Sequence, residues 1–171
     1  MAIVVEDGTG KPDAETLCSV AAFRAYCDGR GLSLVGVTDA RVEQLLRQAN
    51  DYLLTFSGVW KGYRLTATQA LDWPRVGVVV NCYELPSSVI PPAVINAAAA
   101  LAFKAQTGPL MPDVRGIAVK KLKLGPLEKE FDTATAPGNS SAPRYPEISR
   151  LLAGLFNTNA TNPYMVPLRR S

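Results

Sequence analysis

The sequence contains no histidine, and this absence argues against several classes of enzyme at once. Histidine is the usual general base at neutral pH, a member of most catalytic triads and the commonest metal ligand. The three cysteines, Cys18, Cys27 and Cys82, form no CxxC motif and lack the base that activates a thiol nucleophile. We therefore expect no catalytic residue, no metal ligand and no cofactor, and we expect Cys18 and Cys27 to be small buried thiols.

The chain also lacks a long apolar run, since no stretch approaches the roughly 18 apolar residues of a membrane span. The first ten residues, MAIVVEDGTG, contain neither the basic region nor the continuous apolar region of a cleaved signal peptide. We expect a soluble protein with no membrane partner, synthesised in the cytoplasm and not exported by a cleaved signal.

Charge of either sign is modest: 18 Lys and Arg against 15 Asp and Glu give a formal net charge of +3. This balance is weak evidence for a polyanionic partner and is far from the composition of a protein that coats DNA. With 171 residues, the chain is long enough for one domain with a hydrophobic core but short for two.

Two amphipathic helices are predicted in the first third of the chain. Ser19 can cap a helix that extends to about Asp28 and stops at Gly29. Thr38 can cap a stronger helix, in which Asp39 interacts favourably with the N-terminal dipole. The apolar stripe of this second helix consists of Val42, Leu45, Leu46, Ala49 and Leu53.

The segment of residues 63–77, YRLTATQALDWPRVG, combines helix signals with an aromatic residue of the kind found in cores. Thr66 or Thr68 can cap a short helix that runs to Leu71. The proline after Trp73 forces that residue out of helical geometry, so the helix must end there. Because aromatic residues dominate core packing, we expect Trp73 and Leu71 to fill the base of the core.

A strand and a third helix are predicted after this segment. The β-branched run Val76–Val80 favours a strand, and prolines on either side of Ile90 end any regular pairing. Pro92 is favourable at the first position of a helix, which continues over residues 93–106. This helix is so rich in alanine that its neighbours can approach closely, within a bundle or between subunits.

A β-hairpin is predicted over residues 117–132, with its turn at Gly125-Pro126. Lys120, Lys121 and Lys123 form the densest basic cluster of the chain, and Lys121 and Lys123 share one strand face. One interpretation is a solvated strand edge that resists aggregation. The other is non-specific, salt-sensitive contact with DNA phosphates.

The remainder of the chain has the composition of a linker, a short helix and an arm. Residues 133–146 are rich in Ala, Pro, Ser and Gly, and a helix over about Pro146–Phe156 should dock on an apolar surface. We expect residues 157–171 to form an arm ordered by a partner. The sequence thus predicts a mainly α fold: a small helical bundle with a protruding β-hairpin (residues 1–132), followed by the linker, short helix and extended C-terminal arm (residues 133–171).

Two further groups of residues resemble functional sites but are better explained by structure. Asp39, Glu43 and Asp51 lie on a regular helix surface, where charged groups usually only interact with solvent. Gly8 and Gly10 in DGTGKP superficially suggest a phosphate loop, but the GxxxxGK[ST] spacing is absent, so we predict a turn after a short strand.

Base stacking is a further alternative, because Tyr63, Trp60 and Trp73 could stack on single-stranded bases. Such platforms usually accompany a broader positive groove than this chain supplies. No RNP, zinc-finger or helix-turn-helix pattern accompanies the lysines, so sequence-specific recognition of nucleic acid is poorly supported.

The order of several segments resembles a family of tailed-bacteriophage head proteins. The segments are IVVEDGTG, a serine-capped helix ending in RG, a helix containing ANDYL, RLTATQALDWPRVGV, IPPAVINAAAALA and KLKLGPLEKEF. Members are described as head-tail connector, adaptor or head-completion proteins, and many carry the automatic label DnaT-like single-stranded DNA-binding protein. The resemblance covers roughly residues 2–132, and Ala67–Pro74 and Leu124–Leu127 are its most specific parts.

This resemblance implies a dodecameric ring at the head-tail interface of the virion, joining the portal to the tail and lining the DNA exit channel. The implied partners are the portal protein, neighbouring adaptor subunits, a tail or tail-terminator (stopper) protein, and phage double-stranded DNA contacted without specificity. Two groups of residues would then meet the DNA channel or these partners. They are Lys120, Lys121 and Lys123 on the hairpin, and Tyr164, Arg169 and Arg170 on an arm that contacts portal or tail.

The leading hypothesis is therefore a structural head-to-tail adaptor of a tailed bacteriophage, with no enzymatic activity. The alternative, from a different class, is a single-stranded DNA-binding replication protein of the DnaT-like kind. Tight binding of short single strands that is lost when Lys121, Lys123 or Trp60 is replaced would favour this alternative.

Overall fold

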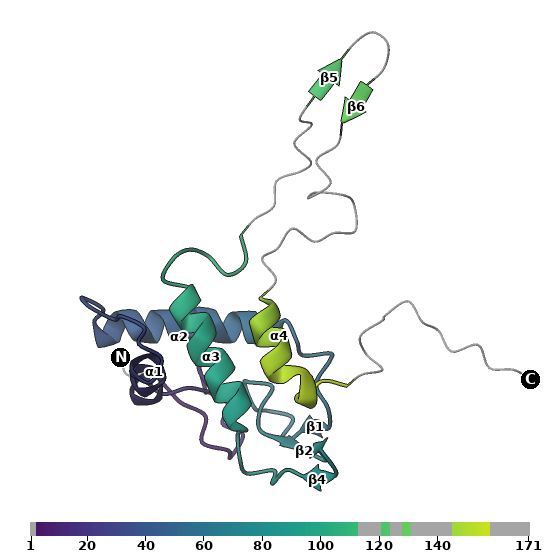
Figure 1. Ribbon diagram of the computed structural model, residues 1–171. Helices are drawn as coiled ribbons and strands as arrows, with labels where there is room; N and C mark the ends of the chain where they lie inside the picture. Colours follow the sequence, from purple (N-terminus) through teal and green to yellow (C-terminus); the bar gives the residue numbers. More distant parts are fainter. Residues whose placement is uncertain (1–2, 113–120, 124–127, 131–144, 158–171) are drawn as a thin grey trace, which may run out of the picture.

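The computed structural model of the protein describes residues 3–112, 121–123, 128–130 and 145–157. These residues form four α-helices and six short strands (Figure 1). The helices are α1 (Val20–Asp28), α2 (Asp39–Leu54), α3 (Pro92–Lys104) and α4 (Pro146–Leu152), and α4 continues into the 3₁₀ helix η2 (Ala153–Leu155). The strands form three antiparallel pairs: β1 (Tyr63–Arg64) with β2 (Arg75–Val76), β3 (Val79–Val80) with β4 (Tyr83–Glu84), and β5 (Lys121–Lys123) with β6 (Glu128–Glu130).

This architecture confirms the predicted mainly α fold, a helical bundle with a protruding β-hairpin. The predicted C-terminal arm lies outside the described residues, as do the predicted linker up to residue 144 and the turn of the hairpin. None of the four helices is both long and apolar enough to cross a membrane.

The bundle is organised around α3, which packs most extensively on α2. In Figure 1, α3 crosses α2, with α1 on one side and α4 on the other. Because α3 is covered by neighbours on several sides, small side chains are needed to let the backbones approach. Its buried residues are Val94, Ala97, Ala98, Ala99, Ala100, Leu101 and Ala102. The close packing predicted for this helix is therefore found inside the bundle.

The first two helices begin where the sequence predicts. The Ser19 hydroxyl accepts a hydrogen bond from the Ala22 backbone N–H at 3.1 Å, and the Thr38 hydroxyl accepts one from Arg41 N–H at 3.3 Å. Each bond satisfies an N–H group that has no partner within its helix. The whole predicted apolar stripe of α2 is buried.

The prediction of a short helix over residues 66–71 is wrong, because this segment forms turns instead. The Thr66 hydroxyl accepts from Gln69 N–H at 3.1 Å, and the Gln69 side-chain oxygen accepts from Thr66 N–H at 2.8 Å. The next N–H, that of Ala70, donates to the Lys11 carbonyl rather than to a helical partner. Side-chain bonds of this kind compete with helix formation. The predicted burial of Leu71 and Trp73 is confirmed.

The strand predicted at Val76–Val80 is divided into β2 and β3. Gly77 separates them with a φ of +70°, a left-handed conformation that glycine adopts without a steric penalty. Val78 is then buried, while Val76 and Val79 on either side of it are partly exposed. The division gives two small strand pairs where one strand was predicted.

Helix α4 docks on an apolar surface, as predicted. Ile148, Leu152 and Leu155 are buried, and α4 packs against α3. The chain then forms an antiparallel bridge between Phe156 and Trp60, in which Asn157 N–H donates to the Val59 carbonyl at 2.7 Å.

Candidate interaction surface

The loop that superficially resembles a phosphate loop is occupied by a side chain of its own. Glu6 is buried, and one of its carboxylate oxygens accepts from the N–H groups of Gly8 at 3.0 Å and Gly10 at 2.9 Å. The other oxygen accepts from Lys11 N–H at 2.8 Å. These are the donors that a phosphate would need. The segment is a turn, as predicted, and it is closed by an internal carboxylate.

The acidic residues of α2 also have structural surroundings. Asp39 pairs with Arg24, and Glu43 lies 3.9 Å from Arg47, while Asp51 is exposed. Residues 3–112 and the other described segments contain no group of three or more Cys, Asp or Glu side chains placed to hold a metal ion. Cys18 and Cys27 are buried, as predicted.

The two tryptophans proposed for base stacking lie in the core, so that interpretation is wrong for both. Trp60 is 5% exposed and Trp73 is 1% exposed, and their rings meet edge to face with centroids 5.7 Å apart. Trp60 Nε1 donates to the Asp72 carboxylate at 3.2 Å. The same carboxylate oxygen accepts from the Ser57 hydroxyl at 2.6 Å. A base cannot reach either indole face. Tyr63, the third residue proposed for stacking, is 80% exposed.

A buried polar network holds the segment between Trp60 and Val76 in place. Arg75 is buried and donates to the carbonyl oxygens of Lys61 and Gly62, each at 2.7 Å, and of Asp72 at 3.2 Å. Gln69 Nε2 donates to the carbonyls of Leu71 and Pro74. Arginine and glutamine thus satisfy backbone groups that this irregular chain cannot pair in a ladder. These side-chain hydrogen bonds fix the positions of the short strands β1 and β2 on the bundle.

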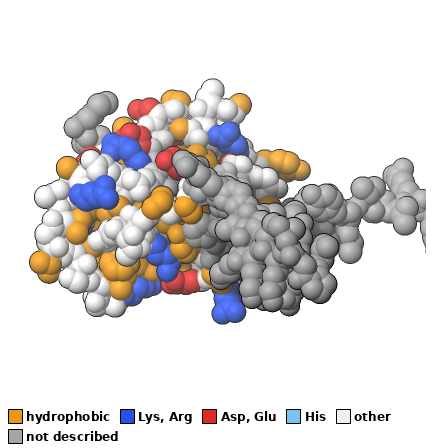
Figure 2. Space-filling model, turned by 90° about the horizontal axis from the view of Figure 1, so that it is seen from above, with side chains coloured by type: hydrophobic (Ala, Val, Ile, Leu, Met, Phe, Trp, Pro, Cys, Tyr) orange, Lys and Arg blue, Asp and Glu red, His pale blue; other side chains and the backbone are white. Residues whose placement is uncertain are grey.

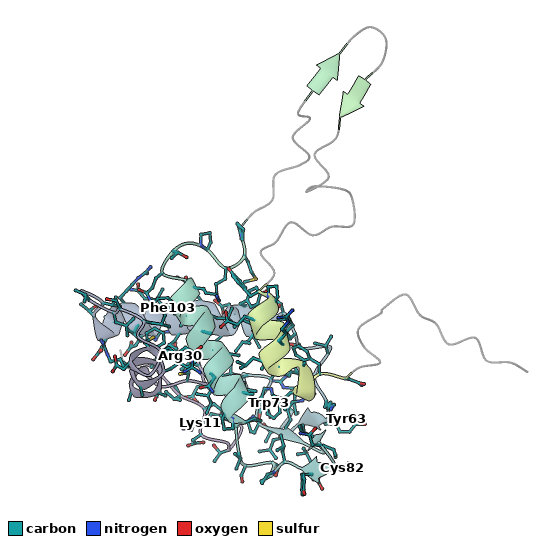
Figure 3. All side chains as sticks on the ribbon, viewed as in Figure 1. Lys11, Arg30, Tyr63, Trp73, Cys82 and Phe103 are labelled. Carbon is teal, nitrogen blue, oxygen red and sulfur yellow. The ribbon has the colours of Figure 1, made fainter. Side chains whose placement is uncertain are left out.

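This scaffold carries an exposed apolar side chain on each of the strands β1 to β4. In the register of β1 and β2, Tyr63 is opposite Val76, and both side chains are exposed. Val79 on β3 and Tyr83 on β4 are also exposed, on opposite faces of their hairpin, because Val79 pairs with Glu84 and Tyr83 pairs with Val80. We call these four residues, Tyr63, Val76, Val79 and Tyr83, the strand patch. Figure 3 shows the labelled Tyr63 and Cys82 at the same end of the molecule.

The turn between β3 and β4 has an unusual sequence. Asn81 and Cys82 have φ values of 51° and 67°, so both lie in the left-handed region. Two-residue hairpin turns with this geometry usually have glycine at the second position, where this chain has Cys82. This hairpin and the exposure of Tyr83 could not be predicted from the sequence, because the Asn-Cys pair is a weak turn signal.

The predicted basic cluster is only partly described. Lys120 lies outside the described residues, as do Tyr164, Arg169 and Arg170. Lys121 and Lys123 lie on β5, where the backbone register puts them opposite Glu130 and Glu128 of β6. Opposite charges at facing positions stabilise an antiparallel pair. Each of the two described lysine positions is therefore matched by an acidic position across the hairpin.

The charge on the bundle is mixed in sign. On the face in Figure 2, basic and acidic side chains of the described residues lie interspersed with apolar ones. A protein that tracks the backbone of a nucleic acid usually has a continuous positive groove.

Taken together, these features define a small helical-bundle protein whose exposed apolar side chains are carried on short strands. The model of a protein family described as "Putative DnaT-like ssDNA binding protein" matches residues 1–171. Because the match covers the whole sequence, the chain belongs to this family. No curated protein and no solved structure matches the chain.

Proposed function

We propose that this protein is a structural head-to-tail adaptor of a tailed bacteriophage, which forms a ring joining the portal to the tail. The observation that carries the proposal is the pair of strands β5 and β6, which contacts no other described element. A two-stranded hairpin is at best marginally stable in water unless something packs against it. A hairpin that projects from its own bundle is therefore suited to packing on a neighbouring subunit or on another protein.

The strand patch supports the same proposal. Its exposed apolar side chains, on short strands at one end of the molecule, are available for contact with another protein, and tyrosine is enriched at such interfaces. In a ring, one surface of each subunit meets a different surface of the next. The hairpin and the strand patch give the protomer two separate surfaces for contacts with neighbouring subunits, the portal, or a tail or stopper protein.

In this proposal the ring surrounds the DNA exit channel at the head-tail interface of the virion. Lys120, Lys121 and Lys123 face the channel or a partner, and any contact with DNA is non-specific and weakens with salt. Residues Tyr164, Arg169 and Arg170 belong to an arm that contacts portal or tail.

The proposal is tested by mixing the purified protein with portal protein and measuring ring formation by sedimentation and electron microscopy. We expect the wild-type chain to join the portal, and replacement of Tyr63 and Val79 by serine to weaken assembly. The matched control is Val35→Ser, since Val35 is 93% exposed and lies outside the strand patch. A chain that stays monomeric with portal, together with virions that lack the protein, would contradict the proposal.

A second candidate function is single-stranded DNA binding, the activity named in the family description. Exposed Tyr63 and Tyr83 are the described aromatic residues that favour it, since each offers a ring on which a base can stack. If this function holds, replacing both by alanine lowers affinity for a short oligothymidine, because stacking contributes about 1–3 kcal/mol per base. Trp60 is unsuitable for this test because it is buried. Unchanged affinity in the double variant would contradict the second candidate.

A further inference from the structure

A small cavity lies between the second half of α2 and the segment around Trp73. Its volume, as the space open to a water-sized sphere, is about 10 Å³. A cavity of roughly 10–15 Å³ on that measure holds one water molecule. Most of the lining is apolar, and the other lining residues carry polar groups. The apolar residues are Leu17, Leu53, Leu54 and Leu71, and the others are Asn50, Trp60, Asp72 and Trp73.

Trp73 has a buried hydrogen-bond donor that its own chain leaves unpaired. The residue is 1% exposed, and its Nε1 donates to no described group. The indole of Trp60, by contrast, donates to the Asp72 carboxylate. Buried donors are nearly always paired, because an unpaired one has lost its hydrogen bond to water without replacement. The Trp73 indole therefore favours a nearby acceptor.

Asn50 has a buried acceptor that is also unpaired. The residue is 2% exposed, and its Oδ1 receives no hydrogen bond from any described residue. Its Nδ2 donates to the Glu15 carbonyl at 3.1 Å. Because a carbonyl oxygen only accepts, this bond determines which end of the Asn50 amide is the nitrogen. The unpaired atom of Asn50 is thus an acceptor, the complement of the unpaired donor of Trp73.

Water is the small molecule that satisfies both groups, since it can accept from one and donate to the other. A metal cation cannot accept from an N–H group, and a halide ion cannot donate to an amide oxygen. The space is about as wide as one water molecule, so a molecule inside it contacts the residues on every side. Buried waters usually make about three hydrogen bonds. The Asp72 carboxylate is the third partner available, because it accepts two bonds from described side chains, both at one oxygen, and has capacity for about four.

We propose that this cavity binds one structural water molecule, which accepts from Trp73 Nε1 and donates to Asn50 Oδ1. The water joins α2 to the segment that leads into β2, and so adds a link to the buried polar network of Gln69 and Arg75. This inference goes beyond the adaptor function and does not depend on it, since it concerns the interior of one protomer.

The test uses the indole N–H signals of the isotope-labelled full-length chain, which has two tryptophans. Trp73→Phe identifies the Trp73 signal by its loss. We expect magnetisation transfer between the Trp73 indole proton and water, with the sign of a water molecule that tumbles with the protein. The measurement is repeated with Ser57→Ala, because the Ser57 hydroxyl exchanges protons with solvent and shares an acceptor with Trp60. The transfer to Trp73 should persist in that variant.

The role of Asn50 is tested by Asn50→Leu, which removes the acceptor at similar volume. We expect the transfer from water to Trp73 to be lost, while an unshifted Trp60 signal shows that the variant is folded. The matched control is Gln48→Leu, which removes an exposed amide from the same helix and should leave the transfer unchanged. Persistence of the transfer in folded Asn50→Leu would overturn the assignment of Asn50 as a partner of the water.

No transfer to Trp73 in the wild-type chain would overturn the proposal. Two other arrangements would then account for the indole: a direct hydrogen bond to Asn50, or an N–H directed at the face of the adjacent Trp60 ring. A crystal structure of the wild-type chain decides the matter if Asn50→Leu does not fold. We expect a water oxygen within about 3.2 Å of both Trp73 Nε1 and Asn50 Oδ1. No density between the two side chains would overturn the proposal.

Discussion

At the scale of single residues, burial separates the three thiols. Cys18 and Cys27 are buried, while Cys82 is exposed at the turn between β3 and β4. Desolvation raises the pKa of Cys18 to about 12 and also raises the pKa of Cys27. Because the thiolate is the reactive form, both should be inert in the folded protein at neutral pH.

We therefore predict that iodoacetamide modifies one thiol of the folded protein and three after denaturation, as measured by intact mass. The control Cys82→Ser should leave the folded protein unmodified. Rapid modification of Cys18 or Cys27 under native conditions would contradict the burial of these two residues.

The burial of individual aromatic residues could be predicted only in part from the sequence. Trp60, Tyr63 and Trp73 occur in a segment without helical or strand periodicity, so the pattern could not separate buried from exposed aromatics. Burial of Trp73 was predicted because aromatic residues dominate core packing. Exposure of Tyr63 depends on its register opposite Val76 and on the inward bonds of Arg75, both of which are contacts between distant residues.

At the scale of elements, α4 is joined to the bundle by apolar contacts. Leu152 is fully buried where α4 packs on α3. We predict that Leu152→Ala lowers the free energy of unfolding by about 2–5 kcal/mol, the usual cost of removing a buried leucine side chain. Urea denaturation followed by circular dichroism measures this change. The matched control is Leu54→Ala on α2, which should cost less because Leu54 is 38% exposed.

The segment before α1 is attached to α2 partly through an ion pair. Arg47 holds the pKa of Glu15 below its usual value, helped by a hydrogen bond from Val4 N–H. A carboxyl group with a depressed pKa in the folded state contributes stability above its unfolded pKa, about 4.3 for Glu. That contribution is lost as the pH falls through the lower folded value.

We therefore predict that the stability of the wild type falls more steeply below about pH 4.3 than that of Glu15→Gln. Denaturation midpoints measured at a series of pH values would test this. Parallel pH profiles for the two proteins would contradict a stabilising role for the ionised Glu15. The control is Glu84→Gln, since Glu84 is exposed and makes no ion pair with a described residue.

Elements differ in how well sequence predicts them. The caps Ser19 and Thr38 and the stripe of α2 are local or periodic features, and all were confirmed. The helix expected at residues 66–71 has a plausible cap, but Gln69 and Lys11 provide bonding partners that replace helical bonds. A groove between the second half of α2 and the turn that precedes Trp73 could not be predicted, because it joins residues from three separate segments.

At the scale of the whole molecule, the bundle and the hairpin are separable. Residues 3–112 and 145–157 share one core, whereas β5 and β6 contact only each other among the described elements. We predict that replacing residues 121–130 with a glycine-serine linker changes the free energy of unfolding by no more than about 0.5 kcal/mol, as for typical surface substitutions. Chemical denaturation of the two chains would measure this.

The variant with the glycine-serine linker also tests whether the hairpin is needed for assembly. If the hairpin packs on a neighbour or on the portal, the replaced chain should fold normally but fail to join the portal in sedimentation experiments. A second variant, Lys121→Gln with Lys123→Gln, removes the charges while keeping the strand positions. Glutamine is a polar residue of similar length that can still donate a hydrogen bond across the hairpin. We therefore expect this variant to retain assembly and to lose only salt-sensitive contact with DNA. Normal assembly by the linker variant would instead leave the strand patch as the surface responsible for ring formation.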